Sequence, residues 1–160
     1  MKAIQFDFFN IGGIRKMYAI PPTSIRRIWQ EYNKGLTYLS LLRRQDIIDL
    51  YIVEDSAEFT EDEKLTPAGP QYAIEIPGII PKNHLPNQKT LIDLDFGRWC
   101  VLFQDNNDIV RLAGNEENQL RFERKSKTGT LQTRNQIEFS FLGMLSEPCY
   151  FIDLDMIENI

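Results

Sequence analysis

Short apolar runs alternate with turn signals through residues 98–152, and this pattern limits the possible folds more than any other feature of the chain. The turn signals are the Asp-Asn-Asn-Asp stretch at 105–108, Gly114-Asn115, and Lys-Thr-Gly at 127–129. Asn, Asp and Gly tolerate the left-handed backbone that tight hairpins require. The nearly even spacing of these turns predicts a meander of antiparallel strands.

The clearest strand is predicted at 135–141, where Ile137, Phe139 and Phe141 alternate with polar residues. Alternation with a period of two indicates a strand with one buried face. Similar patterns predict further strands at 2–9, 15–20, 72–76, 98–103, 109–113, 120–122 and 149–154. We expect the strand at 72–76 to end at Pro77-Gly78, because proline has no backbone N–H to donate to a neighbouring strand.

Two segments fit both a helix and a strand. Residues 24–33 fit a capped helix, but also a strand with Ile25, Arg27 and Trp29 on one face, which we favour. Residues 45–53 are almost continuously apolar, which favours a central strand over a helix that begins at Gln45.

No segment shows a sustained period of 3.6 residues, so we predict a mainly β protein. The expected fold is an antiparallel β-sandwich or a partly open barrel with at most one or two short helices. A length of 160 residues suits one domain over 1–160; two halves, 1–81 and 90–160, joined by a linker at 82–89, are the alternative. The predicted core contains Phe6, Phe8, Leu36, Tyr38, Leu41, Tyr72, Ile74, Trp99, Val101, Ile137, Phe139 and Phe141.

The net charge of −5 argues against binding to nucleic acid, which usually requires a basic face. No apolar run approaches the roughly 20 residues of a transmembrane helix, so no membrane partner is expected. The first ten residues carry Asp7 within their apolar stretch and do not form a signal peptide. These features predict a cytoplasmic protein, or part of a particle assembled in the cytoplasm.

Candidate catalytic and metal-binding groups are sparse. The two cysteines, Cys100 and Cys149, lie in separate apolar runs, so buried free thiols are expected, with a disulfide as the alternative. His84 lies in a Pro- and Asn-rich loop without a nucleophile motif, and the glycines at 12–13 lack a phosphate-loop sequence. We therefore predict no catalytic residue, metal or cofactor.

Two alternatives to that prediction remain. Asp93 and Asp95 are two residues apart, as are Asp153 and Asp155. Within a strand, residues with this spacing share a face. The two pairs would then suit a hydrolase or a cation site. An exposed tryptophan would instead suit a carbohydrate- or protein-binding module; the candidates are Trp29 and Trp99.

Charge is segregated between two segments, 54–63 and 121–134, which we expect to be a surface loop and a hairpin. Opposite potentials steer and register protein interfaces, so the two segments are a candidate contact between neighbouring copies. The acidic residues are Glu54, Asp55, Glu58, Glu61, Asp62 and Glu63, and the basic residues are Arg121, Arg124, Lys125, Lys127 and Arg134.

The C-terminal half also carries a series of turn and strand motifs: RLAGN at 111–115, LRF at 120–122, Thr-Gly at 128–129 and RNQIEFSFLG at 134–143, preceded by YAIEIPGIIPK at 72–82. This series resembles small β-rich virion or tail proteins carried in prophage-like elements of gut bacteria. The resemblance implies a structural protein that self-assembles or binds other particle proteins and has no enzymatic activity.

Overall fold

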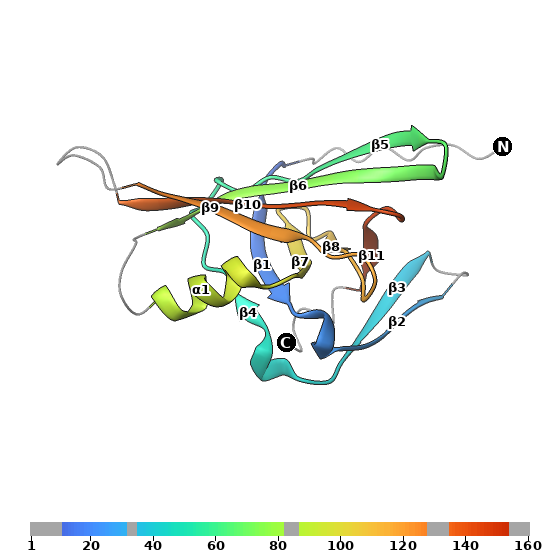
Figure 1. Cartoon of the computed structure of the whole chain (residues 1–160), viewed down its shortest axis with the longest axis horizontal. Coiled ribbons are helices and arrows are strands. Elements are labelled where there is room, and N and C mark those ends of the chain that lie inside the picture. The colour runs from blue at the N-terminus through green and yellow to red at the C-terminus, as the bar shows by residue number, and fades with distance from the viewer. Residues whose placement is uncertain (1–10, 32–34, 82–86, 128–134, 154–160) are drawn as a thin grey trace.

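Two packed β-sheets make up the computed structural model of the chain, which describes residues 11–31, 35–81, 87–127 and 135–153 (Figure 1). Within these residues, seven strands form one sheet in the order β2-β3-β11-β8-β7-β1-β4, and four form the other in the order β5-β6-β10-β9. The prediction of a mainly β sandwich is confirmed, and the sheets do not close into a barrel. The strands are β1 (Ile14–Ile20), β2 (Ile25–Glu31), β3 (Leu36–Leu41), β4 (Ile48–Asp49), β5 (Thr60–Thr66), β6 (Gly69–Pro81), β7 (Cys100–Asp105), β8 (Val110–Ala113), β9 (Arg121–Lys127), β10 (Gln136–Leu145) and β11 (Tyr150–Ile152).

The larger apolar cluster lies between the two sheets. Met17 and Phe103 enter it from the seven-stranded sheet, and Ile76, Phe139 and Phe141 enter it from the four-stranded sheet. Six of the twelve predicted core residues are confirmed as buried, namely Ile74, Trp99, Val101, Ile137, Phe139 and Phe141. Tyr72 is only half-buried, and Phe6, Phe8 and the strand predicted at 2–9 lie outside the described residues.

A second apolar cluster lies on the other face of the seven-stranded sheet. It contains Ile20, Leu39, Cys100, Leu102 and Leu112. The first four residues of β7 enter the two clusters alternately, and Gln104 is buried as well, so five of its six positions are buried. A strand that is covered on both faces needs apolar residues at nearly every position, which explains the continuous run in this part of the sequence.

The strand favoured at 24–33 is confirmed as β2, which forms a hairpin with β3, but the predicted faces of the two strands are not confirmed. A register shift between Ile25 and Arg27 marks a bulge, after which Ile28 points inward and Trp29 is 39% exposed. A bulge of this kind exchanges the faces of all following residues. On β3 the buried residues are Thr37 and Leu39, whereas the predicted core residues Leu36, Tyr38 and Leu41 are half-buried.

Residues 45–53 form neither the predicted central strand nor a helix beginning at Gln45. A 3-10 turn at Arg44–Asp46 is followed by the two-residue strand β4, which pairs with β1 at the edge of the seven-stranded sheet. Leu50 is buried, and Ile48 and Ile52 pack against the core between the sheets. The apolar residues here anchor an irregular segment to the core instead of extending a ladder.

Strand β6 continues through Pro77-Gly78, where a break was predicted. The carbonyl of Pro77 accepts the backbone N–H of Glu58 at 3.3 Å, so the backbone of Pro77 faces the loop before β5 and not β10. The missing N–H of Pro77 therefore removes no bond from the β6–β10 ladder. Glycine at 78 makes room for a neighbouring side chain, because an added Cβ would lie 2.6 Å from the Phe139 ring.

Helix α1 (Gln88–Phe96) lies beside β9 and replaces the strand that would have aligned Asp93 with Asp95 (Figure 1). Its apolar face is formed by Leu91 and Leu94, which are spaced one helical turn apart and are buried. Residues i and i+2 of a helix point in different directions, so Asp93 and Asp95 do not share a face. Both sheets combine strands from before residue 82 with strands from after residue 89, as in the pairs β1–β7 and β6–β10.

Candidate functional site

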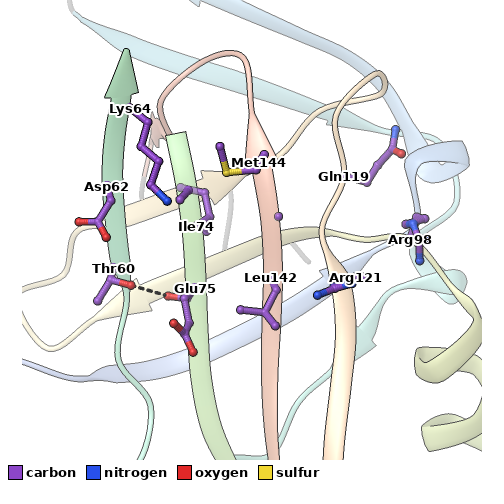
Figure 2. Close-up of a pocket in the computed structure, with 12 residues that line it drawn as sticks. Thr60, Asp62, Lys64, Ile74, Glu75, Arg98, Gln119, Arg121, Leu142 and Met144 are labelled. Carbon is purple, nitrogen blue, oxygen red and sulfur yellow. Dashed lines mark hydrogen bonds between the residues drawn. The ribbon is translucent and has the colours of Figure 1, made fainter. Parts of the chain in front are cut away.

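A hollow of about 520 Å³ opens on the outer face of the four-stranded sheet, the face turned away from the core (Figure 2). Its floor is apolar and is formed by Ala73, Leu142 and Met144, of which Met144 is 47% exposed. Charged side chains from β5, β6 and β9 surround this floor; they are Asp62, Lys64, Glu75 and Arg121, with Arg98 beyond them.

The chemistry of this hollow suits contact with another macromolecule. In Figure 2 the side chains of Lys64 and Arg121 extend across the sheet from its opposite sides, while the carboxylate of Asp62 points away from the other strands. The hydroxyl of Thr60 donates to the carbonyl of Glu75 at 3.4 Å. Protein interfaces usually have an apolar centre, which loses its water on contact, and a polar rim, which can form ion pairs. The hollow has the same arrangement.

Half of the acidic segment is a strand and not the predicted loop. Residues 54–59 form a loop that contains Glu54, Asp55 and Glu58, whereas Glu61, Asp62 and Glu63 belong to β5. Cross-strand pairing explains this difference, because β5 runs alongside β6 from Thr60, opposite Glu75, to Thr66, opposite Gly69. The charge of the segment gave no indication of this pairing.

Glu61 has a role within the molecule. Its carboxylate accepts the backbone N–H of Cys149 at 2.7 Å, which connects β5 to the segment that enters β11. The Asp62 side chain lies on the opposite, outer face of β5, since neighbouring residues of a strand alternate in direction. Glu63 shares the face of Glu61 but is exposed.

The predicted basic residues lie on β9, apart from Arg134, which is outside the described residues. The guanidinium of Arg124 donates to both carboxylate oxygens of Asp95 on α1, from Nε at 2.8 Å and from Nη2 at 2.6 Å. The exposed pairs are Arg121 with Glu123 at 3.0 Å and Lys127 with Glu138 on β10. Lys125 is exposed on the outer face opposite Glu138, and its charge contributes, after the hydrogen bond and charge of Lys127, to lowering the pKa of that carboxyl.

The acidic and basic strands are the two opposite edges of one sheet. The strand order β5-β6-β10-β9 places two strands between them, so a single molecule does not bring the two charged segments together. Within the described part of the chain, β5 pairs with β6 alone and β9 with β10 alone. Over these residues each strand thus has one side without a strand partner, and α1 lies beside β9.

Both cysteines are buried free thiols, as expected. Burial raises the pKa of the Cys100 thiol to about 12, and the nearby Glu116 adds to the shift. Burial also raises the pKa of Cys149, with a further contribution from Glu61. Only a thiolate is an effective nucleophile, so neither cysteine is activated for catalysis.

The two tryptophans are placed differently. Trp99 is buried and its indole N–H donates to the carbonyl of Leu94 at 3.0 Å, which rules it out as an exposed binding platform. Trp29 is stacked on Tyr38 with ring centroids 5.6 Å apart, and the Arg27 guanidinium lies over the same indole at 5.6 Å. The ring of Trp29 is thus already in contact with its own hairpin.

The acidic pairs considered for a hydrolase are not brought together. Asp93 lies on α1, Asp95 is paired with Arg124, and Asp153 follows β11; His84 and Asp155 are outside the described residues. Over the described ranges, no group of three or more His, Cys, Asp or Glu side chains is placed to hold a metal ion.

The Asp-Asn-Asn-Asp stretch at 105–108 forms the predicted hairpin turn. The carboxylate of Asp105 accepts the backbone N–H groups of Asn107 and Ile109, at 2.8 and 2.9 Å. Asp108 adopts the left-handed backbone, with φ of 63°. These bonds use the Asp105 carboxylate within the turn itself.

Comparison of the chain with protein-family models, with curated proteins and with solved structures finds no match. No helix within the described ranges is both long and apolar enough to cross a membrane. Sequence reasoning identified most of the charged edge residues but missed others that line the hollow, namely Lys64, Glu75, Leu142 and Met144. Leu142 and Met144 continue the alternate positions of β10 that Gln136, Glu138 and Ser140 occupy, so the alternation in the sequence already placed them on the outer face of the sheet.

Proposed function

We propose that this chain is a non-enzymatic structural protein whose copies assemble edge to edge, as a component of a phage-like virion or tail particle. The observation that supports the proposal most is the opposite charge of the two edges of the four-stranded sheet. Strand β5 carries three acidic residues and one lysine, and β9 carries four basic residues and one glutamate. Each edge therefore repels a copy of itself and attracts the other edge.

The directions of the strands also suit head-to-tail pairing. Every neighbouring pair in this sheet is antiparallel, and the sheet has four strands, so its two edges run in opposite directions. When a second copy is placed beside the first in the same orientation, its β5 lies antiparallel to β9. Such a contact joins different surfaces of the two copies and generates rings or filaments.

Charge alone does not hold such an assembly. An exposed ion pair contributes about 0–1 kcal/mol, so backbone hydrogen bonds and apolar contacts must supply most of the affinity. Charge complementarity sets the orientation and the rate of association. Added salt should therefore slow association more than it dissociates formed assemblies, because the screening length falls to about 3 Å at 1 M.

Charge reversal tests the proposal. One variant carries Asp62→Lys, and the other carries Lys125→Glu. At low salt, sedimentation velocity should show weaker self-association for each variant alone and restored association in an equimolar mixture. A matched control reverses Glu116 and Glu117, exposed residues of a loop outside the four-stranded sheet, and should assemble as the unmodified protein does.

Two results would contradict the proposal. The first is a monomer at every concentration of the unmodified protein. The second is a mixture of the two reversed variants that associates no better than either variant alone.

A further inference from the structure

We infer that the assembly contact has a single register, in which β9 of one copy pairs with the full length of β5 of the next. In this register Arg121 lies opposite Thr66, and Lys127 lies opposite Thr60. The inference rests on the proposed function, since it specifies how the two edges of neighbouring copies meet.

The lengths and faces of the two strands restrict the possible registers. Over the described residues both strands span seven residues, so only one alignment uses every one of them. Asp62 and Lys64 point to the outer face of the sheet, as do Glu123 and Lys125. A shift by one residue would place outer residues opposite inner residues, so only shifts by an even number preserve the two faces.

In the full-length register, opposite charges face each other on both faces of the sheet. On the outer face Lys125 lies opposite Asp62, and Glu123 lies opposite Lys64. Directly opposed side chains of an antiparallel pair lie about 4.5–5.5 Å apart at Cβ, within reach of an ion pair.

The inner face is matched in the same way. Arg124 lies opposite Glu63, which would join the existing pair of Arg124 with Asp95. Phe122 lies opposite Leu65, which is 86% exposed in the isolated chain and is the most prominent apolar side chain of β5. The register therefore covers an apolar residue that the single molecule leaves in water.

Shifts by two residues place like charges together. In one direction Glu123 faces Asp62 and Arg121 faces Lys64, with one opposite pair, Arg124 with Glu61. In the other direction Lys125 faces Lys64, with one opposite pair, Lys127 with Asp62. The full-length register has three opposite pairs and no like pair. Like charges directly opposite each other destabilise a strand pair, so the charge pattern selects the full-length register among those that preserve the faces.

The register implies a stagger between copies. Within one molecule Thr60, Glu75, Leu142 and Arg121 are level across the sheet. Between copies Thr60 lies opposite Lys127, so each added copy is displaced by six residues along the strands. At about 3.3 Å per residue this displacement is about 20 Å.

Disulfide cross-linking of variants that each carry one added surface cysteine tests the register. Asp62→Cys and Lys125→Cys are purified separately, mixed at a concentration where the unmodified protein is assembled, and mildly oxidised. The inferred register places the two Cα atoms about 4.5–5.5 Å apart, within the range for a disulfide. The native Cys100 and Cys149 are buried and serve as an internal background.

The matched control is a mixture of Lys64→Cys with Lys125→Cys, which would be opposed only in a register shifted by two residues. Diagonal neighbours lie about 7–8 Å apart, so we expect about tenfold less cross-linked dimer in this mixture. Each variant oxidised alone should give none, because the contact joins two different edges.

The outcomes separate the inference from the proposed function. Three results would overturn the register: equal cross-linking in the two mixtures, no cross-linking in either mixture, or cross-linking of one variant with itself. If the unmodified protein assembles in these experiments, the proposed function is still supported. If the unmodified protein does not assemble at all, the proposed function fails and the register fails with it.

Discussion

The two sheets of this protein use their surfaces in different ways. The central strands of the seven-stranded sheet are covered on both faces, so that β7 is buried at five of its six positions. The four-stranded sheet is covered on one face, and β10 alternates between buried and more exposed residues along most of its length. The first sheet is mainly a framework, whereas the second presents a face and two charged edges to its surroundings.

This difference shows where a binding function can be located. A strand covered on both faces has few side chains left for recognition, because nearly all of them fill the core. In the four-stranded sheet, alternate residues are free to vary in charge and size without disturbing the core. The hollow and both charged edges belong to this sheet.

The largest expected effect contrasts the two faces of β10. Phe139 is buried against Phe122 and Phe141, with ring centroids 5.7 and 5.8 Å apart. Phe139→Ala should lower the free energy of unfolding by about 3–5 kcal/mol, because it leaves a cavity among these rings. Leu142→Ala, on the outer face of the same strand, is the matched control and should cost about 1 kcal/mol or less. Urea unfolding of both variants measures the difference, and equal losses would contradict the assignment of the two faces.

A second prediction concerns the buried side of the seven-stranded sheet. Burial in the folded state raises the pKa of Cys100 from 9.0 to about 12. The contribution of the protonated Cys100 thiol to the free energy of unfolding is therefore complete below pH 9 and is lost as the pH rises toward 12. Over this window the unfolded thiol ionises first, which costs up to about 1.4 kcal/mol of stability for each pH unit.

Comparison with Cys100→Ala isolates this contribution. The variant should be less stable than the unmodified protein at pH 7, because it leaves a small cavity, but its stability should fall less steeply between pH 9 and 11. Denaturant unfolding at several pH values measures the two slopes. Parallel curves would mean that Cys100 ionises as readily in the folded protein as in the unfolded chain.

The smallest expected effect compares the two faces of β9. The Arg124–Asp95 pair is bidentate and its side chains are 21% and 30% exposed, whereas those of Arg121 and Glu123 are 59% and 53% exposed. A double-mutant cycle with Arg124→Gln and Asp95→Asn should give a coupling energy of about 1 kcal/mol. The corresponding cycle with Arg121→Gln and Glu123→Gln should give less than about 0.5 kcal/mol. Equal coupling energies would show that α1 does not shield the inner pair from solvent.

The sequence by itself determined the fold class and much of the core. Alternation along 135–141 and the turn residues at 105–108 act over short distances, so they can be recognised without knowledge of the rest of the chain. The buried residues Ile137, Phe139 and Phe141 follow directly from that alternation. The opposite charges of the two edge segments were also visible.

Only the tertiary structure decided which strands are neighbours and which segments depart from the local pattern. The bulge after Ile25, the short β4 and the helix at Gln88–Phe96 all depend on packing against distant residues, which local periodicity does not record. The placement of Glu61–Glu63 on a strand depends on its partner β6. The acidic and basic segments become opposite edges of one sheet because two other strands pair between them, and strand order is set by contacts far apart in sequence.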